Sequence, residues 1–285
     1  MSLVIKKNKR HFFISESEDI MRKKLNKLMA VLLAGCLCTA TLMGCDAGAS
    51  TTGQTGKNLT GTVTLAGSTS MEKVCEALME GFMEKYPGIT VTTEYTGSGA
   101  GIESVNAGSV NIGNASRHIK DEEAAGGAIE NIIALDGIAV IVDSSNTVTN
   151  LTTEELIMIC QGEITNWSEL GGEDEAIVVI GRENGSGTRG AFEELLGIED
   201  SCKYAQELDS TGGVLAKVAS TPGAIGYVSL DVVDDTVSSV ALNGVAATED
   251  NIIAGSYILY RPFVMATMGD VNSQNELVKM WFDYI

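Results

Sequence analysis

The sequence predicts an α/β fold, because one local pattern recurs along the chain. A β-branched or alternating apolar segment is followed by a turn rich in Gly, Ser and Thr, and then by apolar residues at helical spacing. The totals agree with this fold class, since 285 residues with 44% apolar content suffice for one large or two medium domains. Thirty-two glycines against three prolines also indicate many tight turns between regular elements.

Three units of this pattern lie in the first half of the chain. We predict strands at residues 61–66, 89–95 and 110–113. The turns after them are rich in small polar residues and lie at residues 67–70, 96–101 and 114–117. Helices are expected to begin at Met71 and Ile102, where apolar residues take up helical spacing.

A fourth unit, residues 177–196, is the strongest candidate for an anion site. Four β-branched residues predict a buried strand, and a loop of small residues bracketed by Arg182 and Arg189 leads into a helix over 191–196. A helix that starts after such a loop offers free backbone N–H groups and the positive end of its dipole to an anion. The two guanidinium groups add paired donors that suit phosphate or carboxylate.

The four turns are expected to meet at one place. Taken singly, each has a plain explanation, because Ser and Thr cap helices and Gly permits tight turns between strand and helix. In open α/β sheets, however, ligands lie outside the carboxyl ends of the strands, and all four turns follow strands. Together they predict a site for a small oxyanion.

The rest of the chain continues the alternation of strands and helices. Residues 132–142 are apolar throughout and long for one strand, so Gly137 is a candidate for a crossing between two lobes. Thr152 or Thr153, followed by two acidic residues, predicts a helix start. We further expect a short helix from 211 to 218, strands at 224–228 and 256–266, and a helix at 275–284.

The acidic composition excludes several classes of partner. The formal net charge is −19, and residues 45–285 alone hold eleven Lys and Arg against thirty-five Asp and Glu. Such a surface argues against nucleic acid and anionic lipid as partners, so an anion site must act through local donors. Two histidines, and six cysteines without zinc spacing, disfavour a His-based metal site or a Ser-His triad.

Residues 1–44 are predicted to be a secretory signal. A basic segment at 21–27 precedes an apolar run at 28–43, which ends in small residues. The run is short for the ~20 apolar residues of a membrane span, which is the alternative. Residues 1–20 precede a second possible start codon at Met21 and are set aside from the fold.

The segment after the signal is expected to be a membrane tether. The residues that end in Cys45 resemble the bacterial lipobox, which implies cleavage before Cys45 and a lipid on its thiol. Residues 45–58 are then a flexible lipidated tether rich in Gly, Ser and Thr. The remaining cysteines are an odd set that cannot pair fully, so we expect either one disulfide or three buried thiols among Cys75, Cys160 and Cys202.

These features together resemble the phosphate-binding lipoproteins of bacterial phosphate ABC transporters, in the type II periplasmic-binding-protein superfamily. The resemblance runs from about residue 61 to residue 285, and its markers are residues 67–70, 97–99, 136–140, 151–152, 164–167, Arg182 with 185–188, and 223–227. It implies two α/β lobes, each a mixed sheet flanked by helices, with the ligand in the cleft at a hinge that the chain crosses twice. The implied lobe 1 comprises residues 59–136 and 255–285, and the implied lobe 2 comprises residues 137–254.

The resemblance also implies which residues hold phosphate. They are hydroxyl, backbone N–H and guanidinium donors at Thr69, Ser70, Ser98, Arg182, Ser186, Gly187 and Thr188. Three further residues of the same turns complete the predicted phosphate-binding set, namely Ser68, Ser116 and Arg117. No metal or other cofactor is implied, and the family binds its ligand without converting it.

Two positions depart from the family pattern. Members place an aspartate after the serine that matches Ser116, where it accepts the proton of hydrogen phosphate and repels sulfate; this chain has Arg117 there. Members also often carry an acidic residue where this chain has Asn184. The resemblance therefore leaves discrimination against sulfate open.

Alternatives to a role for Arg117 in the site also follow from the sequence. His118 or a backbone carbonyl is an alternative proton acceptor, and Arg117 is alternatively a surface residue over Asp121 or Glu122. Family members usually continue with a further helical segment, so the C-terminus is expected to be truncated.

The predicted function is capture of inorganic phosphate outside the cytoplasm for the transmembrane subunits of an ABC permease. The protein is expected to be a monomer, anchored to the cell membrane through Cys45. A receptor for sulfate, molybdate or a phosphonate is the alternative. A phosphoester hydrolase is disfavoured, because residues 181–188 lack the Gly-Lys pair of a P-loop and no Gly-x-Ser-x-Gly surrounds Ser98 or Ser186.

Overall fold

The computed structural model describes residues 4–7, 10–13 and 59–285. The predicted signal run, the lipid attachment at Cys45 and the tether lie outside these residues. Strands β1 (Val4–Lys7) and β2 (Arg10–Phe13) form an antiparallel hairpin, and β1 pairs with the strand that contains Leu135. No helix in the described part of the chain is long and apolar enough to cross a membrane.

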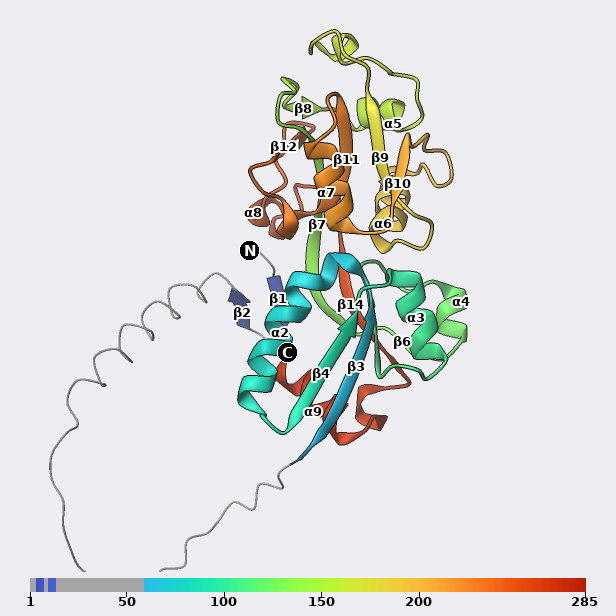
Figure 1. Cartoon of the computed structure of the whole chain (residues 1–285), viewed down its shortest axis with the longest axis vertical. Helices are drawn as coiled ribbons and strands as arrows, with labels where there is room; N and C mark the ends of the chain where they lie inside the picture. The colour runs from blue at the N-terminus through green and yellow to red at the C-terminus, as the bar shows by residue number, and fades with distance from the viewer. Residues whose placement is uncertain (1–3, 8–9, 14–58) are drawn as a thin grey trace, which may run out of the picture.

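Strand β7 (Ile132–Asp143) joins the two lobes of the molecule. Its first half pairs with β14 (Tyr260–Met268), and its second half pairs with β11 (Ala224–Ser229), in both cases antiparallel. Figure 1 shows β7 and the chain that leads into β14 as the connections between the upper and the lower lobe. Residues 132–142, which are long for one strand, therefore form a single strand. Gly137 lies opposite Tyr260, at the point where the partner of β7 changes from β14 to β11.

Lobe 1 contains the elements from β3 to the first half of β7 and those from β14 onward. In its sheet β3 is parallel to β4 and β5, and β14 is antiparallel to β5. Helices α2 and α9 cover one face through Phe82 and Trp281, and α3 covers the other through Ile102. The bounds are β3 (Gly61–Gly67), η1 (Thr69–Met71), α2 (Glu72–Lys85), β4 (Ile89–Glu94), α3 (Ser98–Asn106), β5 (Ile112–Ala115), α4 (Asp121–Ala125), β6 (Ala128–Ile129), η4 (Val271–Ser273) and α9 (Glu276–Tyr284).

Lobe 2 contains the elements between the two crossings. Strand β9 is parallel to both β10 and β11. Helices α5 and α6 cover one face of this sheet through Leu156 and Phe192, and α7 covers the other through Val214. The bounds are β8 (Asn150–Leu151), α5 (Thr153–Cys160), η2 (Trp167–Leu170), β9 (Val178–Arg182), α6 (Gly187–Leu196), β10 (Gln206–Leu208), α7 (Thr211–Ala219), η3 (Leu230–Val232), β12 (Val237–Ser239), β13 (Ala241–Leu242) and α8 (Glu249–Ile253).

The apolar cores of lobe 1 and lobe 2 meet at the two crossings between the lobes, which are β7 and the chain that leads into β14. On β7, Ala134 packs in the core of lobe 1 and Ile138 in that of lobe 2. On the second crossing, Tyr257 and Leu259 pack in lobe 2, whereas Phe263 packs in lobe 1. We therefore propose to keep the first boundary at 136/137 and to move the second from 254/255 to a point after Leu259.

Two helices begin earlier than the apolar spacing indicates. Helix α3 starts at Ser98 rather than at Ile102, and α6 starts at Gly187 rather than at 191. The Ser186 side chain caps α6 by accepting a hydrogen bond from the backbone N–H of Arg189 at 3.3 Å. The small polar residues of both turns consequently belong to first helical turns, where backbone N–H groups are free of intrahelical partners.

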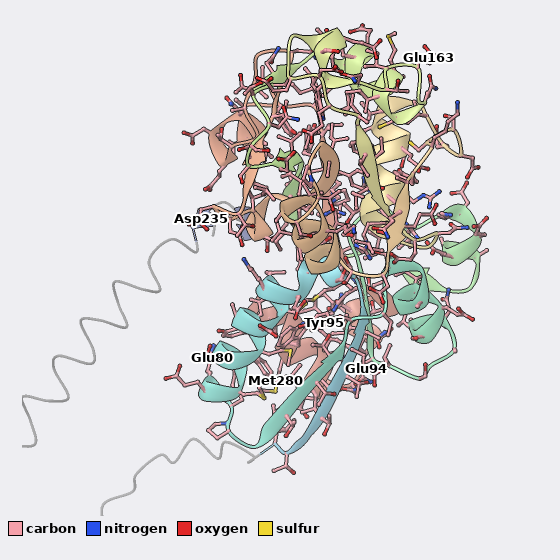
Figure 2. All side chains as sticks on the ribbon, turned by 45° about the horizontal axis from the view of Figure 1, so that its top comes forward. Glu80, Glu94, Tyr95, Glu163, Asp235 and Met280 are labelled. Atoms are coloured by element: carbon pink, nitrogen blue, oxygen red, sulfur yellow. The ribbon has the colours of Figure 1, made fainter. Side chains whose placement is uncertain are left out.

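The surface agrees with the acidic composition. Glu80 and Glu94 on lobe 1, and Glu163 and Asp235 on lobe 2, are exposed carboxylates (Figure 2). Because acidic side chains project from both lobes, a site that binds an anion must be enclosed and must supply its own donors.

The three cysteines of the described residues carry free thiols. Cys75 and Cys160 are buried and Cys202 is half-buried. Burial, with a smaller effect of the neighbouring Glu76, raises the pKa of the Cys75 thiol to about 12. Of the two expected arrangements, the structure therefore has three thiols rather than a disulfide.

Candidate anion-binding site

Four hydroxyl groups from the two lobes form a continuous hydrogen-bonded chain, which we call the hydroxyl chain. Ser70 Oγ of lobe 1 lies 2.7 Å from Thr188 Oγ1 and 2.9 Å from Thr211 Oγ1 of lobe 2. Thr69 Oγ1 lies 3.0 Å from Thr211 Oγ1. All four side chains are buried, so the chain is an enclosed polar contact between the lobes.

The local fold brings these hydroxyls together at helix N-termini. Thr69 and Ser70 lie in η1 between β3 and α2, and Thr188 lies in the first turn of α6 after β9. Thr211 is the first residue of α7, after β10. Each residue thus follows the carboxyl end of a strand, as predicted for the four turns, and α6 and α7 both direct the positive ends of their dipoles at this place.

Three serines form a second group beside the chain. Ser68 Oγ donates to Ser116 Oγ at 2.8 Å, and Ser98 Oγ lies 3.3 Å from Ser116 Oγ. Gly187 of lobe 2 lies against them so closely that an added Cβ would stand 2.7 Å from Ser116 Oγ and would also clash with Ser98 Oγ. The three serines and Gly187 of the predicted set are therefore brought together at one place between the lobes.

Arg182 contacts the hydroxyl chain on one side, at Thr211. Its side chain is buried, and its Nη1 donates to Thr211 Oγ1 at 3.0 Å. Nε and Nη2 donate to the two carboxylate oxygens of Glu183 at 3.0 and 2.9 Å. Glu183 therefore holds the guanidinium so that the remaining nitrogen points at the hydroxyl chain, as a ligand-binding arginine requires.

Arg261, which the sequence analysis did not single out, ends the hydroxyl chain on the other side. Its Nη1 donates to Thr188 Oγ1 at 2.9 Å and to the backbone oxygen of Ser116 at 2.7 Å. Nε and Nη2 donate to Asp136 Oδ2 at 3.1 and 2.9 Å. An arginine inside the otherwise apolar segment 256–266 was the signal in the sequence that could have found it.

Asp136 is a buried carboxyl group that also accepts a hydrogen bond from Ser229 Oγ at 2.7 Å. Burial raises its pKa to about 7, against the opposing effect of the Arg261 charge. The residue therefore exchanges its proton near neutral pH. Thr211, the other residue missed in this site, is the second residue of a Ser-Thr-Gly-Gly turn of the same kind as the four turns singled out.

Arg117 lies to one side of the hydroxyl chain. Its Nη1 and Nη2 each donate to Glu123 at 2.7 Å, and Nη1 also donates to the His118 backbone oxygen. Although burial acts to raise it, the pKa of Glu123 is lowered by the hydrogen bond from Arg117. The His118 ring is 65% exposed and lies 2.9 Å from Glu130, so it is turned toward that carboxylate.

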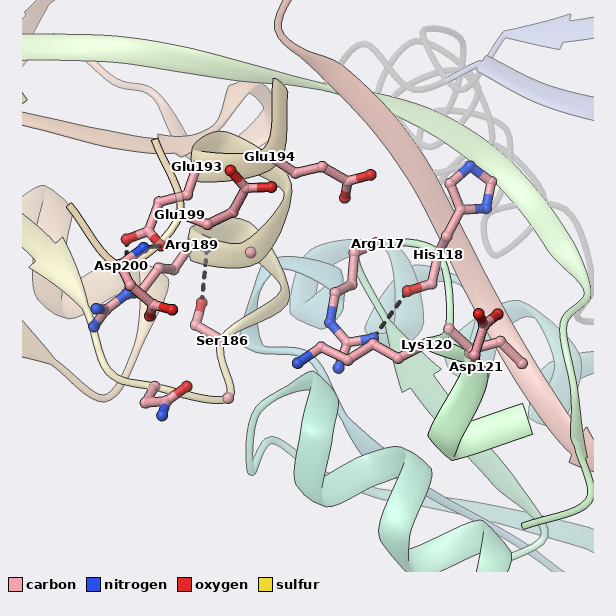
Figure 3. Close-up of a pocket in the computed structure, with 14 residues that line it drawn as sticks. Arg117, His118, Lys120, Asp121, Ser186, Arg189, Glu193, Glu194, Glu199 and Asp200 are labelled. Carbon is pink, nitrogen blue, oxygen red and sulfur yellow. Dashed lines mark hydrogen bonds and ion pairs between the residues drawn. The ribbon is translucent and has the colours of Figure 1, made fainter. Parts of the chain in front are cut away.

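A pocket of about 500 Å³ opens between the lobes, lined by residues 117–121 of lobe 1 and by residues from 184 to 200 of lobe 2. Figure 3 shows Arg117 and Lys120 of lobe 1 facing Ser186, Arg189 and Glu194 of lobe 2. Arg189 lies 2.9 Å from Glu193 and 3.0 Å from Glu207. Since five carboxylates line this pocket, at Asp121, Glu193, Glu194, Glu199 and Asp200, it is less suited to an anion than the enclosed hydroxyl chain.

In the part of the chain that the structure describes, no three His, Cys, Asp or Glu side chains are grouped so that they could hold a metal ion. The donors at the hydroxyl chain are hydroxyl, backbone N–H and guanidinium groups, which suit an oxyanion. The arrangement can therefore enclose and desolvate a small oxyanion between two lobes.

Known proteins share this architecture. Residues 49–285 match the sequence profile of a family described as a PBP superfamily domain. The Bacillus subtilis (strain 168) phosphate-binding protein PstS is 31% identical over 272 residues, which cover 92% of this chain and 89% of that protein.

Two solved structures are similar in sequence and in fold. A putative phosphate ABC transporter substrate-binding protein with bound phosphate from Clostridium perfringens has a TM-score of 0.74 at 40% identity, covering 79% of this chain and 93% of that one. An ABC-type phosphate transport receptor from Vibrio cholerae has a TM-score of 0.65 at 33% identity, covering 78% and 92%. The predicted family resemblance and the predicted type II two-lobed fold are confirmed by these matches. The chain therefore belongs to the PBP superfamily and, within it, to the family of the phosphate-binding proteins named PstS.

Proposed function

We propose that this protein captures inorganic phosphate as the extracytoplasmic solute-binding protein of an ABC transporter. The observation that carries the proposal is the hydroxyl chain, which spans both lobes and accepts a hydrogen bond from the guanidinium of Arg182. The relatives named above, of which one holds bound phosphate, support the same ligand.

The chemistry of the site suits a tetrahedral oxyanion. Hydroxyl groups both donate and accept hydrogen bonds, so those that bond to one another between the lobes can turn toward an anion held there. Ser70, Thr188 and Thr211 then donate from two sides, and the first-turn N–H groups of α6 and α7 add donors without a net charge. Arg182 supplies the positive charge that the acidic surface lacks.

The remaining predicted ligands are proposed to act from the serine group. Ser68, Ser98 and Ser116 lie beside the hydroxyl chain, and the backbone N–H groups of Ser186 and Gly187 open α6. Arg117 stays a predicted ligand, although both of its Nη atoms are bound by Glu123. The names of the relatives describe binding and transport, so we propose that this chain binds its ligand without converting it.

The anchor, the location and the partner are also proposals. A basic head, an apolar run and a lipobox-like end before Cys45 favour export and a lipid on that thiol. The protein would then act as a monomer at the outer side of the cell membrane and deliver phosphate to the permease subunits of the transporter.

Another oxyanion is the second candidate, and one observation favours it. Arg117 stands where the family aspartate accepts the proton of hydrogen phosphate, and Glu123, the carboxylate beside it, is engaged by that arginine. Sulfate has no proton to donate. Its binding affinity is therefore reduced less in this site than in relatives that carry the aspartate.

Calorimetric titration of the purified protein with phosphate, arsenate and sulfate tests the proposal. We expect phosphate and arsenate to bind tightly and to compete with each other. Tight binding of sulfate with no heat from phosphate would replace phosphate by the second candidate, and turnover of a phosphoester would revive the hydrolase alternative.

A further inference from the structure

Arg182 and Arg261 are arranged alike on either side of Ser70 in the hydroxyl chain, Arg182 at Thr211 and Arg261 at Thr188. Each uses Nε and Nη2 to bind one carboxylate, Glu183 in the first case and Asp136 in the second. Each directs its Nη1 at a threonine hydroxyl of the chain, at 3.0 and 2.9 Å. The two guanidinium groups therefore contact the two threonines that flank Ser70 in the hydroxyl chain.

Stability alone gives a weak account of the Arg261–Asp136 pair. The two side chains are 1% and 2% exposed, and they are directly opposite each other on β14 and β7, at the crossing between the lobes. Taking two charges out of water offsets most of their attraction, so a buried ion pair contributes little to stability compared with apolar residues. A role at the site explains why the crossing strands carry charges here.

The contact of Arg261 with Thr188 points to that role. The Asp136 carboxylate occupies the Nε and Nη2 side of the guanidinium, while Nη1 extends past it to the hydroxyl chain and to the Ser116 carbonyl. Thr188 and Ser116 are both predicted phosphate ligands, so Nη1 lies among the donors that the proposed function assigns to the anion.

We infer that Arg261 is a second anion-binding arginine, which holds the ion together with Arg182, and that Asp136 is the residue that positions it. The inference rests on the proposed function and deepens it. A second guanidinium favours ions that carry more negative charge, and the loss of the family aspartate at position 117 acts in the same direction. The site consequently binds sulfate as well as phosphate, with Arg261 contributing to both.

The test compares phosphate and sulfate binding by calorimetry in four variants of the full chain. Arg261→Gln with Asp136→Asn removes both charges together, which avoids leaving one of them buried and unpaired. R261K keeps the charge but lacks the planar fork. R182Q reports on the proposed function. D143N alters a buried carboxylate at the far end of β7, remote from the hydroxyl chain, and serves as the control for loss of stability.

We expect the double variant to bind both anions about 10- to 100-fold more weakly, which is the usual effect of losing a hydrogen bond to a charged group. R261K should be intermediate, and D143N should lower the unfolding midpoint while its anion affinity matches the wild type. If R182Q weakens binding but the double variant keeps wild-type affinity, the inference on Arg261 is overturned and the proposed function stands. If the wild type gives no heat with either anion, both fail.

Discussion

The Lys73 ammonium group of lobe 1 donates to the backbone oxygen of Asp231 of lobe 2 at 3.0 Å, rather than to the Asp231 carboxylate. Among the described residues, neither carboxylate oxygen of Asp231 has a hydrogen-bond partner, and the residue is buried. A buried carboxylate without donors disfavours its own ionised form, so this contact between the lobes holds a group whose charge state depends on pH.

Replacing Asp231 should stabilise the protein at alkaline pH. Burial raises the pKa of Asp231 above its ordinary value of 3.8. The protonated form of Asp231 contributes stability that is fully present below pH 3.8, the ordinary value. This stability is lost as the pH rises through the raised pKa of the folded protein. D231N should therefore unfold at a higher temperature than the wild type at pH 8, by an amount equivalent to about 1–3 kcal/mol.

The pH series supplies the control for this prediction. In thermal scans, the stability gap between D231N and the wild type should shrink steadily as the pH is lowered from 8 toward the ordinary value of 3.8, because the wild-type carboxyl group takes up its proton over that range. A D231N midpoint at or below that of the wild type at pH 8 would show that the carboxylate has a donor after all.

Sulfate affinity should rise as the pH falls through neutrality. Burial raises the pKa of Asp136 from 3.8 to about 7, so below that pH Asp136 takes up a proton and no longer neutralises Arg261. The charged and polar groups that face Asp136 are Arg261 on β14, Asp231 on η3 and Ser229 on β11. Titrations at pH 6 and pH 8 should give tighter sulfate binding at pH 6.

Sulfate is the chosen ligand because it has no proton to exchange in this range, whereas phosphate changes its own charge there. D136N keeps an oxygen acceptor for Arg261 but cannot ionise. It should therefore bind sulfate tightly, and its sulfate affinity should not change with pH in the way attributed to Asp136. An equally steep profile in D136N would assign the effect to another group.

Arg182 and Glu183 should differ sharply in their effect on phosphate binding. R182A removes the guanidinium that donates to Thr211 of the hydroxyl chain, and we expect about 100-fold weaker binding by calorimetry. E183Q keeps an acceptor oxygen for the Arg182 fork, and the Glu183 side chain is 33% exposed, so its loss of charge should change affinity about fivefold or less. Similar affinities for the two variants would remove Arg182 from the site.

Glycine at position 187 should be required for the two lobes to meet. A Cβ there would collide with Ser98 Oγ and would stand 2.7 Å from Ser116 Oγ, and relief of such crowding typically costs about 1–3 kcal/mol. G187A should therefore weaken phosphate binding about tenfold or more, since the hydroxyl groups of the two lobes meet only when the lobes approach each other.

Gly190 on the same helix provides the matched control. An added Cβ at Gly190 would lie 3.4 Å from Arg117 Cδ, which is an ordinary contact. G190A should bind phosphate as the wild type does, and both variants should keep helix α6, because alanine favours helices over glycine. If G187A binds as tightly as G190A in the same titration, the close approach of Gly187 to the serines has no part in binding.

The parts of the site that the sequence predicted are those encoded locally. Ser70, Ser98 and Thr188 each stand directly between a strand and a helix in the chain, so a short window reveals them. The helix starts at Ser98 and Gly187 were placed too late, because Gly, Ser and Thr are weak helix formers whose first-turn positions depend on capping rather than on apolar spacing.

Non-local pairing accounts for what was missed. Arg261 reaches the site only because β14 lies beside β7, which brings it opposite Asp136, a residue 125 positions earlier in the chain. Tyr257 and Leu259 likewise belong to lobe 2 through packing partners that no short window contains. The alternative that placed Arg117 on the surface over Asp121 or Glu122 is wrong, because the side chain is buried and pairs with Glu123, whose carboxylate also accepts from the Lys120 N–H.

Strand β7 and its pairing with β14 also determine the order in which the molecule can be completed. Gly137 and Tyr260 are paired across the two strands, so the chain leaves lobe 1 and returns to it at the same place, and lobe 2 is an insertion within lobe 1. During synthesis every residue of lobe 2 emerges before β14 and α9, which carry Phe263 and Trp281 into the core of lobe 1. Lobe 2 can therefore fold before the last segments of lobe 1 have been synthesised. The anion site between the lobes forms only after lobe 1 is complete.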